Sequence, residues 1–119
     1  MSIQRAKEVA REAYEVNRIF CSVMGDGTRP EWENISEENR NQFVTEVLEI
    51  SAFPDMTFEK YCEDRFCAMG RSGWKHGPIE NAEIKEHPYM LPYAQLPQKR
   101  QIKEQVFYLV VRAGFDNWK

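Results

Sequence analysis

Ring and cationic side chains are concentrated in one stretch of the chain, residues 73–93. This stretch contains His76, His87, Trp74 and Lys85, together with three of the six prolines and two of the six glycines. A histidine and a lysine beside an aromatic plane are suited to recognising a phosphate or a heterocycle, through charge-assisted hydrogen bonds and stacking. The alternative is that the two histidines only tie loop carbonyls together. With no Cys, Asp or Glu at a recognised ligand spacing, the pair predicts no metal site.

Two earlier segments also carry candidate ligand-binding side chains. Asn17 and Arg18 share one side of a predicted helix with Tyr14 and Cys21, because residues three, four and seven apart are neighbours on a helix. In one interpretation this side faces a ligand; in the other it is a solvated face, or it carries a structural hydrogen bond from Arg18 to a loop carbonyl. Trp32 lies in a loop, where it either plugs the edge of the core or offers a planar ligand a stacking surface.

Helical periodicity of apolar residues predicts the elements that hold these loops. A first helix is expected over residues 2–24, and Gly25 ends it. A second helix is capped by Asn34 or Ser36 and ends at Pro54. The expected inward residues of the first helix are Ile3, Ala6, Val9, Ala10, Ala13, Val16, Phe20 and Val23, and those of the second are Phe43, Val44, Val47, Leu48 and Ile50.

Two more helices flank the loop of residues 73–93. Thr57 caps the third helix, and Gly70 or Gly73 closes it. Pro97 is expected as the first residue of the fourth helix, and Gly114 as its stop. The expected inward residues are Phe58, Tyr61, Cys62, Phe66 and Met69 in the third helix, and Ile102, Val106, Leu109, Val110 and Ala113 in the fourth.

The last turns of the fourth helix are apolar nearly all round, because Phe107, Tyr108 and Val111 lie outside its expected inward face. Such a surface is either deeply buried or used for self-association, so a homodimer through this helix is one hypothesis. Phe115 and Trp118 are expected to fold back over the core.

Length and helical periodicity predict a mainly α fold of one domain, residues 1–119: about four helices packed around one core, with a long Gly/Pro/aromatic loop between helices three and four. Apolar residues make up 42% of the 119 residues and aromatic residues 13%, which is typical of a folded globule. A net charge of -3 gives no reason to expect nucleic acid as a partner.

The same sequence predicts a location away from membranes. No run of 18 apolar residues and no secretory signal is present, so we expect no membrane contact. The odd set of Cys21, Cys62 and Cys67 predicts buried or half-buried free thiols in a reducing cytoplasm.

Catalytic motifs are missing from the sequence. It has no Gly-x-Ser-x-Gly elbow, no P-loop and no His-Glu-x-x-His. A protein without enzymatic activity and without a cofactor is therefore expected.

One series of residues resembles a known family. In order, the series is Glu15, Asn17-Arg18, Cys21, Gly25-Asp26, Pro30, Trp32-Glu33, Gly73-Trp74, Gly77-Pro78, Lys85, His87-Pro88, Leu91, Pro92-Tyr93 and Leu96. In order and spacing it resembles the ryanodine receptor repeat domain, which also occurs as a single copy in small bacterial and phage proteins. Tyr14, His76 and Arg65 depart from the family pattern.

The resemblance implies a mainly helical domain without catalytic activity, with short extended or β pieces in the long loop between helices three and four. In the large receptors, paired copies look able to bind adenine nucleotides, and single copies have been suggested to sense or sequester nucleotide-derived signals. Calcium release does not transfer, because the sequence offers no membrane span.

The leading hypothesis is a non-catalytic module that binds a small nucleotide-like or nucleotide-derived ligand. Trp32 and Trp74 would stack, Arg18, Lys85 and His87 would contact a phosphate or polar edge, and Asn17 with Tyr93 would fix the orientation; His76 completes the candidate set. The alternative is a protein-interaction or structural module that self-associates through the apolar C-terminal helix. An enzyme acting on a nucleotide-derived signal ranks third.

Overall fold

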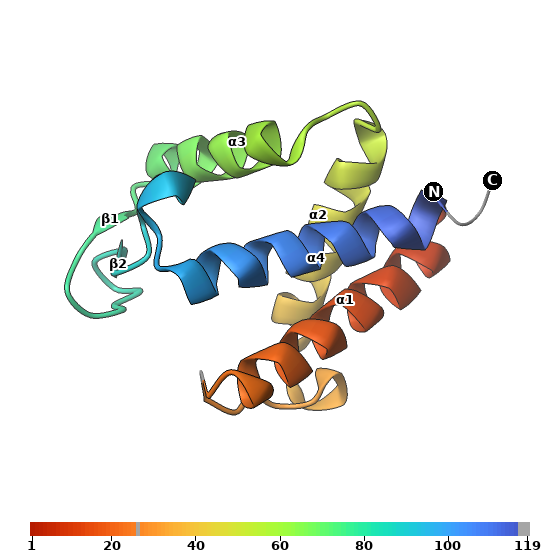
Figure 1. Ribbon diagram of the computed structural model, residues 1–119, viewed down its shortest axis with the longest axis horizontal. Helices are drawn as coiled ribbons and strands as arrows, with labels where there is room; N and C mark the ends of the chain where they lie inside the picture. The colour runs from red at the N-terminus through yellow and green to blue at the C-terminus, as the bar shows by residue number, and fades with distance from the viewer. Residues whose placement is uncertain (26, 117–119) are drawn as a thin grey trace. The chain divides into compact units, whose positions relative to one another are not determined.

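The computed structural model describes residues 1–25 and 27–116, and within them the chain is mainly helical (Figure 1). The predicted fold class is thereby confirmed, including the short strand pair between the third and fourth helices. The residues form two compact units. Unit 1 comprises Met1–Asp55 with the described residues from Ile102 onward, and unit 2 comprises Met56–Gln101. The predicted folding back of Phe115 and Trp118 lies outside the described side chains.

Three helices begin at side-chain caps that the sequence predicts or allows. The hydroxyl of Ser2 accepts a hydrogen bond from Arg5 N at 3.1 Å and starts α1, Ile3–Val23. Ser36, rather than Asn34, caps α2, Glu37–Ala52, and Thr57 caps α3, Phe58–Arg71. Each cap satisfies an amide that the first turn of the helix would leave unpaired.

The fourth helix, α4, spans Gln98–Asp116, so both of its predicted ends are corrected. Pro97 lies just before the helix, where its carbonyl accepts hydrogen bonds from Arg100 N and Gln101 N. Gly114 does not stop the helix. Instead it lets α4 approach α1 closely, since a Cβ at Gly114 would come within 2.9 Å of Val9 Cγ2. The guanidinium of Arg5 also donates to the Gly114 carbonyl at 2.8 Å.

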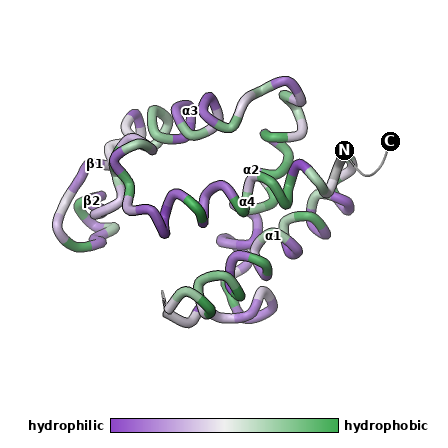
Figure 2. The backbone as a smooth tube through the Cα atoms, in the orientation of Figure 1, coloured by the Kyte–Doolittle hydropathy of each residue, from purple (hydrophilic) through white to green (hydrophobic). Residues whose placement is uncertain are grey.

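This close approach fixes which side of α4 faces inward. The predicted face is wrong at two of its five positions, and the other three are half-buried. Leu109 is 59% exposed and Ala113 is also exposed, whereas Phe107, Tyr108 and Val111 are buried. Figure 2 shows hydrophobic residues clustered in this part of α4. Because nearly every position from 106 to 111 is apolar, periodicity alone favours no single face, and the contact of Gly114 with α1 decides it.

Small residues make up much of the buried face of α1, which packs against α2 in unit 1. Ala6, Ala10 and Ala13 are fully buried, and their size allows close backbone approach. The predicted inward positions Val16 and Val23 are wrong, with 41% and 77% exposure, and Ile3 at 63% is a third such error. These side chains follow the helical period but lie outside the narrow alanine face. The α2 prediction is confirmed at its buried positions, which are Val44, Val47 and Ile50.

The cysteines are free thiols, with Cys21 buried and Cys62 half-buried as predicted. Cys67 is exposed, which corrects the prediction for that residue. Within the described part of the chain, no helix has the length and apolar character needed to cross a bilayer.

Unit 2 places two short strands after α3. β1, Lys75–His76, pairs in parallel with β2, Glu86–His87 (Figure 1). The short 3-10 helix η2, Tyr93–Gln95, then leads to α4. Tyr61 of α3 and Met90 are buried, so both lie in the apolar interior of the fold.

Candidate functional site

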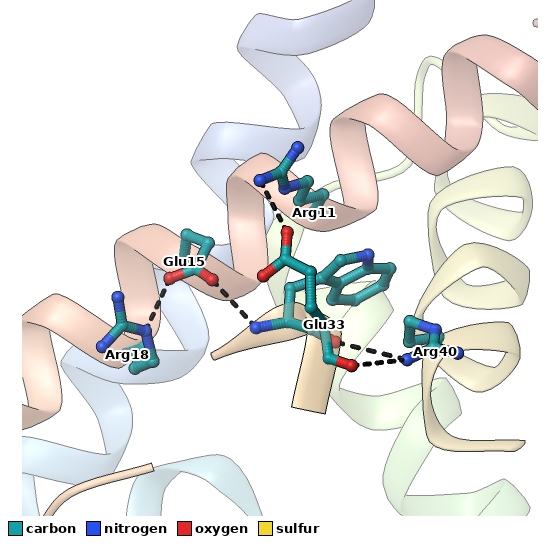
Figure 3. Close-up of polar contacts among 6 residues, drawn as sticks. Arg11, Glu15, Arg18, Glu33 and Arg40 are labelled. Atoms are coloured by element: carbon teal, nitrogen blue, oxygen red, sulfur yellow. Dashed lines mark hydrogen bonds and ion pairs between the residues drawn. The ribbon is translucent and has the colours of Figure 1, made fainter. Parts of the chain in front are cut away.

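The Trp32 loop of unit 1 is held by side chains of two helices (Figure 3). Glu15 of α1 accepts a hydrogen bond from Trp32 N at 2.9 Å, at the start of the 3-10 helix η1, Trp32–Asn34. Arg40 of α2 donates to the Ile35 carbonyl at 2.7 Å, and more weakly to the carbonyls of Trp32 and Glu33. The backbone polar groups of this loop are therefore used by the scaffold.

Two further contacts from α1 help to hold the Trp32 loop. The Tyr14 hydroxyl donates to the Pro30 carbonyl at 2.6 Å, and Arg11 pairs with Glu33 at 2.6 Å. Burial raises the pKa of Tyr14, which keeps its hydroxyl a donor. The hydrogen bond from Trp32 N lowers the pKa of Glu15, and the bond from Arg18 acts in the same direction. The loop thus depends on an ionised Glu15 and a neutral Tyr14.

Arg18 supports the Trp32 loop indirectly, through Glu15. Its Nε donates to Glu15 at 2.5 Å, and Glu15 in turn holds Trp32 N. Arg18 therefore does not bond a loop carbonyl in this contact, and the Glu15 carboxylate links its guanidinium to the Trp32 amide instead. Asn17 is 8% exposed, and its Oδ1 has no hydrogen-bond partner among the described residues.

Trp32 belongs to an aromatic cluster at the edge of the core. Its ring centroid lies 5.6 Å from that of Tyr14 and 6.2 Å from that of Phe43, and Phe43 contacts Phe107 at 5.9 Å. Such tilted arrangements are favourable for aromatic pairs. Of the two interpretations of Trp32, the geometry matches a side chain that packs at the edge of the core, and part of that side chain is still exposed.

In unit 2, Gly73 and Trp74 form the C-terminal cap of α3. Gly73 has φ +94, its amide bonds to the Gly70 carbonyl, and the amide of Trp74 bonds to the Met69 carbonyl at 3.1 Å. These two bonds define a Schellman motif, in which a glycine takes the left-handed conformation. Gly73, one of the two predicted stops, is therefore confirmed.

Lys85 reinforces this cap from across the loop. Its Nζ donates to the Ser72 carbonyl at 2.6 Å, and its own backbone has φ 55, a left-handed conformation that is uncommon for lysine. A ligand that contacted the Lys85 ammonium group would therefore compete with the Ser72 carbonyl for it.

The strand register sorts the side chains of β1 and β2 onto two faces. Lys75 pairs with Glu86 in the register, and Lys75 Nζ lies 3.6 Å from Glu86 Oε2. Gly77 lies on the same face, because a Cβ there would come within 2.6 Å of Glu86 Cβ. Since successive residues of a strand alternate between faces, the cross-strand partners His76 and His87 lie on the other face.

The two histidines differ in their hydrogen bonds. His87 Nδ1 accepts a hydrogen bond from Tyr89 N at 3.0 Å, and its Nε2 lies 3.9 Å from Glu80 Oε2. The His87 and Tyr89 rings are 5.5 Å apart, and the Arg100 guanidinium lies 5.0 Å from the centre of the Tyr89 ring. His76 is exposed, and its ring has no partner among the described residues.

Tyr93 is used by the structure around η2. Its ring contacts Phe58 edge-on at 5.2 Å, and its carbonyl accepts a hydrogen bond from Gln101 Nε2 at 2.9 Å. Its hydroxyl also lies 3.5 Å from the Gln101 carbonyl.

The predicted site residues thus fall into two sets. Asn17, Arg18 and Trp32 belong to unit 1, and the remaining five belong to unit 2: Trp74, His76, Lys85, His87 and Tyr93. Within unit 2 the strand pair brings His76 and His87 together. No group of three His, Cys, Asp or Glu side chains suited to a metal ion occurs in residues 1–25 and 27–116.

Sequence reasoning missed the residues that hold the Trp32 loop. Glu15 belongs to the family-like series, and its spacing of three from Arg18 is that of a helical ion pair, which is the signal in the sequence that could have identified it. The role of Arg40 had no signal in the sequence, because its contacts depend on the loop geometry.

Comparison of the chain with models of known protein families, and with curated proteins, finds no match.

Proposed function

We propose that this chain is a non-catalytic binding module for a nucleotide-like or nucleotide-derived small molecule, acting in a reducing cytoplasm. Such a module would sense or sequester a signal. The resemblance of residues 15–96 to the ryanodine receptor repeat domain motivates the ligand class. Three free cysteines are compatible with the compartment.

One observation carries the proposal. Trp74 and His76 are the two ring side chains of residues 73–93 that make no side-chain hydrogen bond or ring contact with the described residues. Trp74 is half-exposed and His76 exposed, while the neighbouring rings of His87, Tyr89 and Tyr93 all have partners.

The position of these two side chains suits a planar ligand. Trp74 directly precedes β1, and His76 is the second residue of that strand, so the two side chains lie close together in the sequence at this end of the strand pair. The Trp74 backbone is fixed by the α3 cap, so the indole is presented from a rigid support. Base–aromatic stacking contributes roughly 1–3 kcal/mol.

Intrinsic fluorescence tests the proposal directly. Titration with AMP, cyclic AMP and ADP-ribose is expected to quench tryptophan emission, and Trp74→Phe is expected to remove the quench. Trp32→Phe is the matched control, because Trp32 is a member of the aromatic cluster of unit 1 and should leave the response intact. A quench that survives Trp74→Phe, or no response to any of the three compounds, would contradict the proposal.

A further inference from the structure

The strand β1 has one paired edge and one open edge. Lys75 N donates to the Lys85 carbonyl at 2.9 Å, and Gly77 N donates to the His87 carbonyl at 3.3 Å, so both amides point toward β2. Because the N–H and C=O groups of successive strand residues point to opposite edges, those of His76 point away from β2. His76 is exposed, and among the described residues no strand pairs with this outer edge of β1.

This open edge offers one amide donor. The Trp74 amide is already used, because it donates to the Met69 carbonyl at 3.1 Å in the α3 cap. Pro78 has no amide hydrogen. Since the amides of Lys75 and Gly77 bond to β2 and its flank, the His76 amide is the one that remains for a partner in residues 74–78. A peptide strand needs a row of such groups, so the edge suits a partner with a much shorter hydrogen-bonding edge.

We propose that the backbone amide and carbonyl of His76 bind the nucleobase of the ligand, through a base edge on which a donor lies next to an acceptor. This inference rests on the proposed function and adds to it the class of base and the groups that recognise it. Adenine has such an edge, because its N6 amino donor lies beside its N7 acceptor. The N–H and C=O of one residue can form two hydrogen bonds with this edge, as they do with an opposite residue in an antiparallel sheet.

The scaffold holds these two backbone groups in place from both sides. On the N-terminal side, the α3 cap fixes the backbone of Trp74. On the C-terminal side, Gly77 lies so close to β2 that a Cβ there would come within 2.6 Å of Glu86 Cβ. Backbone groups that are already fixed lose little conformational entropy when a ligand binds.

Stacking and base-edge contacts are compatible at this edge. A base held by the His76 backbone lies near the plane of the strand pair, whereas side chains of a strand stand roughly perpendicular to that plane. An aromatic side chain beside the edge can therefore cover one face of the base. Trp74 directly precedes β1 and is half-exposed, so it is the residue that we expect to stack.

Removing the donor from the base tests the contact. Purine riboside 3′,5′-cyclic monophosphate differs from cyclic AMP only in lacking the N6 amino group. Isothermal titration of the full chain with both compounds should show that cyclic AMP binds about three- to tenfold more tightly, as for one hydrogen bond. His76→Ala should keep this ratio, because alanine has the same backbone groups.

Removing the donor from the protein is the complementary test. His76→Pro has no amide hydrogen at this position, and proline is tolerated in a strand where the N–H faces solvent. The amide NMR signals of Lys75 and Gly77 verify that the bonds to β2 remain. Compared with His76→Ala, His76→Pro should bind both compounds about three- to tenfold more weakly, because both keep the N7 acceptor.

The outcomes distinguish this inference from the proposed function. If cyclic AMP and its deamino analogue bind the wild-type chain equally, the proposed function stands and the base-edge contact is refuted. Equal affinities of His76→Pro and His76→Ala for cyclic AMP also refute it. The comparison of the two ligands decides alone if His76→Pro disturbs the strand pair. If neither compound binds, and AMP and ADP-ribose also give no response, both proposals fail.

Discussion

Replacing Glu15 by alanine should loosen the Trp32 loop and destabilise the protein. The carboxylate accepts hydrogen bonds from Trp32 N at 2.9 Å and from Arg18 Nε at 2.5 Å. A hydrogen bond to a charged group contributes about 1.5–3 kcal/mol, and the lower end applies because the Glu15 side chain is 24% exposed.

The expected loss for Glu15→Ala is therefore about 2 kcal/mol in the free energy of unfolding, or about 8 °C in Tm for a chain of this length. Glu15→Gln keeps an acceptor for Trp32 N and should lose about 1 kcal/mol. Urea denaturation followed by tryptophan fluorescence measures both. Glu12→Ala is the control, because Glu12 is an exposed acid of the same helix without a partner among the described residues.

The pH dependence of this loss has a defined sign. The pKa of Glu15 is lowered in the fold from its ordinary value of 4.5, mainly by the Trp32 N–H. Its contribution is therefore complete above pH 4.5 and is lost as the pH falls through the lowered value. The gap between wild type and Glu15→Ala should narrow below pH 4.5. Equal losses in Glu12→Ala and Glu15→Ala, or a gap that acid leaves unchanged, would refute the reasoning.

Two further predictions concern the backbone. Gly114→Ala should lower the free energy of unfolding by about 1–3 kcal/mol, because the new Cβ would collide with Val9. Gly70→Ala in α3 should raise it by about 0.5–1 kcal/mol, because the new Cβ meets only the Met90 methyl group at 3.8 Å. Denaturation midpoints that rank the two variants in the opposite order would contradict this prediction. Lys85→Gly should be about 1 kcal/mol less destabilising than Lys85→Ala. Both variants lose the hydrogen bond to the Ser72 carbonyl, but only glycine adopts the positive φ of this position without strain. Equal free energies of unfolding for the two variants would contradict this prediction.

The sequence predicted most of the helix starts for a local reason. Ser2, Ser36 and Thr57 act on amides within three residues of themselves, so their effect does not depend on tertiary structure. The same holds for Gly73, whose left-handed conformation closes α3.

The inward face of α4 was not predictable in this way. With apolar residues on nearly all sides, its rotation is set by the close approach of Gly114 to Val9, which is a contact between distant parts of the chain. The same applies to Leu109, which follows the helical period and is nevertheless 59% exposed.

The candidate site shows a similar division. The sequence identified His76 and His87 as chemistry-bearing residues, but their placement on one face follows from a register set by backbone bonds. Lys85 was predicted as a ligand contact, and only its positive φ and the Ser72 carbonyl reveal its capping role.

The central claim is that residues 73–89 of unit 2 bind the ligand through Trp74 and His76. Backbone amide NMR of the full chain during titration with cyclic AMP tests it most directly. We expect shift changes concentrated at Trp74, His76 and His87, with the Trp74 indole N–H among the largest. Saturable shifts confined to residues outside 73–89, or no shifts at all, would contradict it.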